Sequence, residues 1–134
     1  MDEQRVRLFT VDEANALLPM LTPVLEEIRA VYLRIHDAAR TVAEFEARAG
    51  GNGHGEHTEV FAPENDLRSI HQELSERVEY LHAMGVELKD VENGVVDFPT
   101  RVGDRLVLLC WRLGEKEIGF WHDPESGFAG RTPL

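Results

Sequence analysis

Side chains able to do chemistry crowd into one stretch near the C-terminus, LLCWRLGEKEIGFWHD, residues 108–123. The stretch contains a thiol, carboxylates and an imidazole, at Cys110, Glu115, Glu117 and His122. Carboxylate oxygens suit hard divalent cations, whereas thiolate and imidazole suit zinc and other transition metals. No HExxH, CxxC or EF-hand spacing is present, so the composition of the stretch does not by itself define a metal site.

Alternation of apolar and polar residues predicts that this stretch belongs to an antiparallel sheet. One hairpin should turn at Asn93-Gly94, because Asn-Gly accepts the positive φ angles of a tight turn. A second should turn at Gly114-Glu115, and PTRVGD at 99–104 should join the two. The result is a meander of about four strands over residues 86–122, followed by a tail that contains glycine and proline.

In this register, charged residues meet across neighbouring strands. Asp90 lies opposite Asp97, and Arg112 lies opposite Glu117. Like charges directly opposite one another destabilise a sheet. The register therefore predicts that a cation, an arginine or a shared proton offsets the repulsion between Asp90 and Asp97.

The same register divides the sheet into two faces, because directly opposite residues share a face. The face expected to pack on helices carries Val91, Val96, Phe98, Val107, Leu109, Trp111, Ile118 and Phe120, with Lys89 and His122 near its ends. The other face, of mixed polarity, carries Leu88, Asp90, Asp97, Leu106, Leu108, Cys110, Arg112, Glu117, Gly119 and Trp121. A bulge or a longer loop at 102–104 would swap the faces between the hairpins.

Two helices should precede the sheet. Thr10 and Glu13 form a T-x-x-E capping box, the signature of a helix start. Pro19 should interrupt the helix, which predicts a short helix at about 11–18 and a long one at about 20–48. Apolar residues at near-heptad spacing predict another helix at about 64–84, after a glycine-rich loop at about 50–62.

The fold class is therefore α+β: a kinked, long antiparallel helical hairpin packed on a small antiparallel meander. A single domain should span residues 1–134. The net charge of −11 disfavours nucleic acid and anionic membrane surfaces as partners. The start MDEQRVRLFT lacks a signal-peptide pattern and no stretch has the length of a membrane helix, so a cytoplasmic location is expected.

Two interpretations of function follow, and the first is preferred. In the first, the protein is a non-enzymatic homo-oligomer, paired through its amphipathic helices or the Trp121 face, with a structural or interface network of Asp90, Asp97, Arg112 and Glu117. In the second, it binds a divalent metal or a small molecule, and could be an enzyme. The metal ligands would be Asp90, Asp97, Glu115 and His122, and the ligand or interface residues would be Arg112, Glu117, Trp121 and Arg131.

Three further residues could ligate a metal or react, but the sequence gives each of them another explanation. Cys110, in mid-strand beside Leu108 and Leu109, is expected to be a small buried hydrophobe. His54 and His57 could also ligate a metal, but a glycine-rich loop gives them no rigid scaffold.

Three segments together resemble the bacterial family called domain of unknown function 2203: FTVDEANALLPML, GVELKDVENGVVDFP and LLCWRLGEKEIGFWHDPESGFAGRTPL. The resemblance covers nearly all residues except those at about 50–62. It implies a small cytosolic bacterial protein and carries no assigned activity. The family pattern falls on Lys89, Asp90, Asp97, Arg112, Glu115, Trp121, His122, Gly127 and Arg131.

Overall fold

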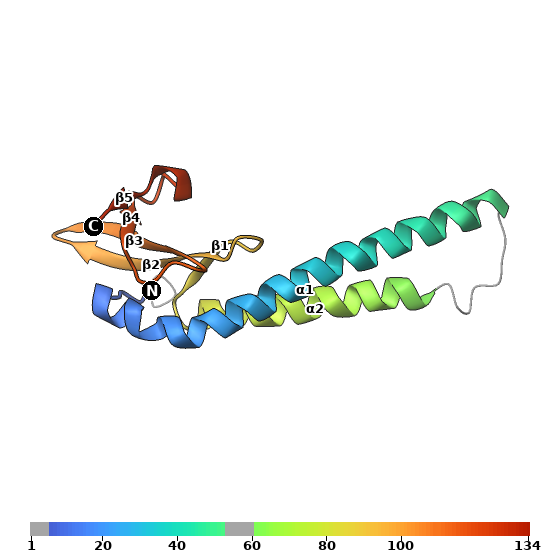
Figure 1. Cartoon of the computed structure of the whole chain (residues 1–134), viewed down its shortest axis with the longest axis horizontal. Helices are drawn as coiled ribbons and strands as arrows, with labels where there is room; N and C mark the ends of the chain where they lie inside the picture. The colour runs from blue at the N-terminus through green and yellow to red at the C-terminus, as the bar shows by residue number, and fades with distance from the viewer. Residues whose placement is uncertain (1–5, 53–60) are drawn as a thin grey trace.

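Two long antiparallel helices carry a small sheet at one end (Figure 1). The computed structural model describes residues 6–52 and 61–134, so His54 and His57 lie outside the described residues. The first helix, α1, is Val11–Asn52, and the second, α2, is Phe61–Ala83. The sheet lies where α1 begins and α2 ends, and the rest of the helical hairpin extends away from it. Among the described residues, no helix is long and apolar enough to cross a membrane.

The start of α1 has the predicted capping box. The Thr10 amide donates to Glu13 Oε1 at 2.9 Å, and the Glu13 amide donates to Thr10 Oγ1 at 3.0 Å. The predicted break at Pro19 is wrong, because α1 is one continuous helix through Pro19 and Pro23. Both prolines are exposed, so water can reach the carbonyl groups that lose their helical partners there.

The sheet has five antiparallel strands in the order β1-β2-β3-β4-β5, one more than predicted. The strands are β1 (Glu87–Asp90), β2 (Val95–Val102), β3 (Arg105–Arg112), β4 (Phe120–His122) and β5 (Thr132–Pro133). A 3-10 turn at Phe128–Gly130 lies between β4 and β5. The extra strand pairs Trp121 with Thr132 and so returns the tail to the sheet.

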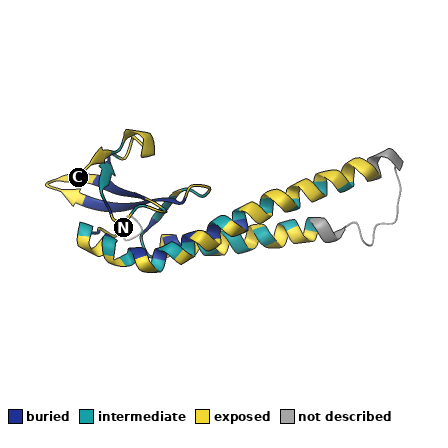
Figure 2. Ribbon diagram, in the orientation of Figure 1, coloured by how far each residue is buried: buried dark blue, intermediate teal, exposed yellow. Residues whose placement is uncertain are grey.

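The core lies between α1 and one face of the sheet (Figure 2). Phe9 and Phe98 meet edge to face, with ring centroids 5.3 Å apart. The buried cluster consists of Phe9, Ala14, Leu18, Leu21, Leu25, Ile28, Leu81, Val86, Val96, Phe98, Leu109, Trp111 and Ile118. Burial falls off along the hairpin away from the sheet, where both helices are largely exposed or half-buried.

The first hairpin differs from the predicted register because a bulge lies between Leu88 and Asp90. Asp90 therefore pairs with Val95, and Glu87 lies opposite Asp97, so the predicted Asp90–Asp97 pair is wrong. The bulge also places Leu88 opposite Val96, against the core rather than on the far face.

Strands β2 and β3 keep the predicted faces although their pairing moves by two residues. Val102 pairs with Arg105, so Gly103, with φ of 62°, and Asp104 form the turn. A shift of two residues preserves the alternation of a strand. Val96, Phe98, Val107, Leu109 and Trp111 therefore lie on the helix side, as predicted.

The connection between β3 and β4 is longer than the predicted two-residue turn and spans residues 113–119. Leu109 pairs with Trp121 and Cys110 with Phe120, a slip of one residue from the prediction. A one-residue slip exchanges the two faces of a strand. Trp121 therefore packs against the core, whereas Phe120 and His122 lie on the far face, and all three placements correct the prediction.

Candidate functional site

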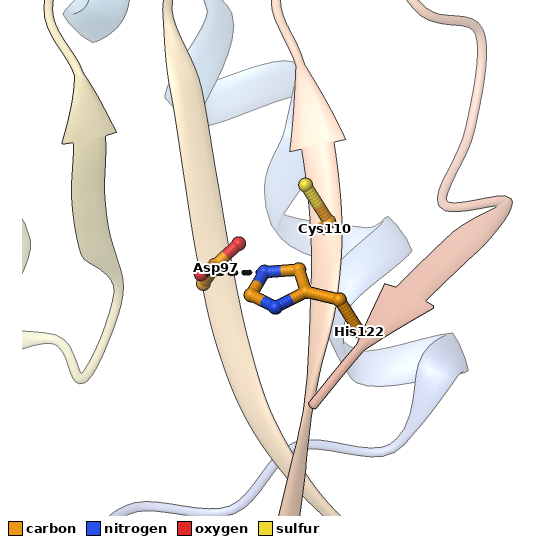
Figure 3. A group of neighbouring side chains, drawn as sticks. All are labelled: Asp97, Cys110 and His122. Carbon is orange, nitrogen blue, oxygen red and sulfur yellow. Dashed lines mark hydrogen bonds and ion pairs between the residues drawn. The ribbon is translucent and has the colours of Figure 1, made fainter. Parts of the chain in front are cut away.

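Three neighbouring strands bring Asp97, Cys110 and His122 together on the sheet face that points away from the helices (Figure 3). Asp97 of β2 pairs directly with Cys110 of β3, and His122 of β4 pairs with Leu108, two residues from Cys110. A carboxylate oxygen, the thiol sulfur and a ring nitrogen all lie within 4.8 Å of one another. All three residues are buried, with exposed fractions of 0%, 0% and 3%.

The hydrogen bonds of His122 require a proton or another cation beside Asp97. Nδ1 lies 2.7 Å from the carbonyl oxygen of Asp123, which can only accept, so Nδ1 carries a hydrogen. Nε2 lies 2.9 Å from Asp97 Oδ2. With its hydrogen on Nδ1, a neutral ring would point the lone pair of Nε2 at an ionised carboxylate, and the two would repel each other. A proton, on the ring or on Asp97, or another cation must therefore lie between these two groups.

The carboxylate of Asp97 can accept more hydrogen bonds than the described side chains donate to it. Its Oδ1 atom is buried and has no hydrogen-bond partner among the described residues. Burial raises the pKa of Asp97 above its usual value, although the hydrogen bond and the charge of His122, and the nearby Cys110 thiol, act in the opposite direction. A thiol is only a weak donor, so this buried oxygen is incompletely satisfied, which favours a further group at this position.

The Cys110 thiol is protonated at neutral pH in the absence of a metal. Burial, together with the neighbouring Asp97 carboxylate, raises the pKa of Cys110 to about 11. Arg131 Nη1 approaches the sulfur at 3.9 Å. Thiol nucleophilicity requires the thiolate, so Cys110 is not set up as a free nucleophile. A coordinated metal ion, by contrast, deprotonates a thiol outright.

A cavity of about 290 Å³ lies beside this cluster. Asp97 and His122 form part of its wall, with Lys89 from β1 and Ser126 and Phe128 from the tail. The volume is ample for water and suffices for a small ligand. The far face of the sheet thus combines three potential metal ligands with a space next to them.

The tail is held over this face by Arg131. Its guanidinium binds Glu115 through two nitrogens, with Nη1 3.2 Å from Oε1 and Nη2 on Oε2. It also lies 3.9 Å from the ring centroid of Phe120 and 4.1 Å from that of Phe128. Burial alone would raise the pKa of Glu115, but the bonds from Arg131 and from the Arg112 amide hold it below its usual value.

A family model that covers residues 7–134 matches this chain, and its description is an uncharacterized conserved protein, DUF2203. The chain belongs to the DUF2203 family. The match confirms the resemblance seen in the sequence motifs. Comparison with curated proteins and with solved structures gave no match.

The resemblance placed the family pattern on nine residues, and seven of them form two groups around the far face of the sheet. Five line the cavity: Lys89, Asp90, Asp97, His122 and Gly127. Glu115 and Arg131 form the clamp that holds the tail. Arg112 Nη2 lies 3.5 Å from Asn93 Oδ1, and Trp121 packs against the core.

Of the four predicted metal ligands, only Asp97 and His122 are brought together. Asp90 instead closes its own turn, with Oδ1 accepting from the Asn93 amide at 3.1 Å and Oδ2 from Asn93 Nδ2 at 2.9 Å. Glu115 is committed to Arg131. These bonds explain why neither carboxylate joins the cluster.

The predicted pairing of Arg112 with Glu117 does not form, because Arg112 lies opposite Val95 and Glu117 is exposed in the 113–119 connection. Cys110 is buried, as expected, but the sequence interpretation missed its place beside His122. The signal was present, since Cys110 and Asp97 already shared a predicted face. Only the one-residue slip of β4 adds His122.

Proposed function

We propose that the protein binds a zinc-type transition metal ion through Asp97, Cys110 and His122. One observation carries the proposal: His122 Nδ1 faces a carbonyl oxygen and Nε2 lies 2.9 Å from the Asp97 carboxylate, so a proton or another cation must lie between Nε2 and Asp97. A proton meets this requirement in the metal-free protein. A metal ion meets it too, and also offers a partner to the buried Asp97 Oδ1.

The donor set supports zinc over magnesium or calcium, because thiolate and imidazole are ligands of softer ions. Tetrahedral zinc, with bonds of roughly 2.0–2.3 Å, needs donor atoms about 3.3–3.7 Å apart. The three donors lie within 4.8 Å of one another, and His122 Nε2 and Asp97 Oδ2, which are 2.9 Å apart in the metal-free protein, would separate slightly to admit the ion. His122 Nδ1 also donates to the Asp123 carbonyl, and such a bond from the second ring nitrogen typically fixes the orientation of a metal-ligating imidazole.

Three protein ligands and an adjacent cavity describe a centre with an open coordination position. A zinc ion in such a position polarises a bound water or ligand atom. Lys89, at the cavity wall, would place a positive charge near a bound anion. We include a cytoplasmic location in the proposal, where reducing conditions keep Cys110 available as a ligand.

The test is a competition titration of the untagged, chelator-treated protein with Zn²⁺. We expect one tight site per chain and a rise in the melting temperature on loading, since an ion that binds only the folded state stabilises it. Asp97→Asn, Cys110→Ser and His122→Gln should each weaken binding at least about tenfold. The matched controls are Asp66→Asn and His71→Gln, which change exposed residues of α2. Equal affinity in the site variants and the controls would reject the site.

A second candidate function is self-association through the helical hairpin. Beyond the sheet, several apolar residues of the two helices stay only half-buried: Ile35, Val42 and Phe45 in α1, and Leu67, Ile70 and Leu74 in α2. Two helices leave one side of such a row open, whereas a four-helix bundle closes it. The occupant would be the hairpin of a second copy, which makes the protein a homo-oligomer.

Sedimentation equilibrium across a wide concentration range tests self-association independently of the metal. We expect a dimer or a larger closed assembly whose mass is unchanged by Cys110→Ser. A monomer at every concentration would reject this second function and leave the metal proposal intact.

A further inference from the structure

A second cavity, of about 490 Å³, lies on the helix side of the sheet near the β2–β3 turn. Thr10 and Val11, at the start of α1, form one edge of it. Val107 and Leu109, each 2% exposed, contribute buried apolar surface, and the half-buried Trp121 forms another part of the wall. An apolar space of this size is typical of sites for small organic molecules.

A few polar groups accompany this apolar lining. Arg105, which pairs with Val102 beside the β2–β3 turn, lines the cavity. The hydroxyl-bearing Thr10 and Thr100 line it as well. The guanidinium of Arg105 binds Asp123, but the two side chains are 62% and 44% exposed. An exposed ion pair contributes little stability, and arginine has five N–H donors. Arg105 can therefore bind a second carboxylate at the edge of the cavity.

We propose that this cavity binds a small amphipathic carboxylate, with its apolar chain against Val107, Leu109 and Trp121 and its carboxylate on Arg105. The charge favours this class of ligand. In a chain of net charge −11, both charged side chains that line the cavity, Arg101 and Arg105, are basic, and among the described residues only Arg105 has an acidic partner, Asp123, which lies outside the lining. The cavity lies on the sheet face opposite to Asp97 and Cys110, so the proposal does not depend on the metal.

The test uses three ligands with the same eight-carbon chain and different head groups: octanoate, octanol and octylammonium. Isothermal titration calorimetry of the full chain should show one octanoate site, and ligand binding beside Trp121 should change the tryptophan fluorescence. Octanol should bind more weakly, and octylammonium weakest of all. Equal or tighter binding of octanol or octylammonium would overturn the head-group assignment, and no saturable binding of any of them would overturn the site.

Two variants complete the test. Arg105→Gln should weaken octanoate binding by about tenfold or more, as expected for the loss of a charge-assisted hydrogen bond, without weakening octanol binding. The matched control is Arg40→Gln, an exposed arginine of α1 that also pairs with an aspartate, Asp37. Octanoate binding that is insensitive to Arg105→Gln would overturn the proposal. The ligand series on the unmodified chain remains decisive even if the variant folds poorly.

Discussion

Comparing Asp97→Ala with Asp97→Asn tests whether Asp97 stabilises the fold through its hydrogen bond to His122 or only by filling space. In Asp97→Ala, His122 keeps its bond to the Asp123 carbonyl, but its Nε2 loses the partner at 2.9 Å inside the protein. Removing one member of a buried pair costs about 3–5 kcal/mol. In Asp97→Asn, the side-chain amide can donate to Nε2 of a neutral ring, so the cost should stay below about 1.5 kcal/mol.

The assay is urea unfolding in the presence of a chelator, so that only the metal-free protein is compared. For a chain of this length, the alanine variant should also melt about 10–20 °C below the unmodified protein, at roughly 3–5 °C per kcal/mol. Asp66→Ala, on the exposed surface of α2, is the control and should stay within about 0.5 kcal/mol. Equal losses in Asp97→Ala and Asp97→Asn would refute the argument that the bond to Nε2 matters.

Three further predictions concern the elements around the site. Arg131→Lys should destabilise the chain by about 1–2 kcal/mol in urea unfolding, because lysine cannot bind Glu115 through two nitrogens or stack between two rings; unchanged stability would contradict the clamp. The side chain and amide of Asn93 hold the pKa of Asp90 below its usual value, so Asp90 contributes stability above its unfolded pKa and loses it as the pH falls through the folded pKa. Asp90→Asn should therefore be less stable at pH 7 and converge with the unmodified chain in acid; a constant gap in pH-dependent melting would argue against this. Pro19→Ala should stabilise the chain by about 1–2 kcal/mol by restoring a helical hydrogen bond on an exposed face, and a loss of stability would show that the proline fits α1 better than its exposure indicates.

Local signals explain which parts of the fold the sequence could predict. The capping box at Thr10 and Glu13, and the alternation of β2 and β3, depend on neighbouring residues and are present as expected. The observed pairing of β2 with β3 differs from the predicted register by two residues, but the predicted faces stay correct because strand faces repeat every two residues. Pro19 was overestimated because its propensity effect was outweighed by the packing of one continuous helix on the sheet.

The candidate site depends on contacts that no local pattern encodes. The connection at 113–119 is set by the Ile118 amide, which donates to Asn15 Oδ1 of α1 at 2.7 Å, and by Trp111 Nε1, which donates to the Glu115 carbonyl at 3.1 Å. These bonds set the one-residue slip that places His122 beside Asp97. Glycine and glutamate at 114–115 looked like a tight turn, so the sequence predicted Asp97 and Cys110 on the correct face of the sheet and His122 on the wrong one.

Cobalt substitution tests the central claim most directly, because the colour of Co²⁺ reports both geometry and ligand type. One equivalent of Co²⁺ added to the untagged, metal-free protein should give the intense visible bands of a tetrahedral site and a near-ultraviolet band from thiolate coordination. Cys110→Ser should abolish the thiolate band, and His122→Gln should abolish both. A spectrum of hydrated Co²⁺ in the unmodified protein would contradict the metal centre and leave Asp97 and His122 as a buried pair that shares a proton.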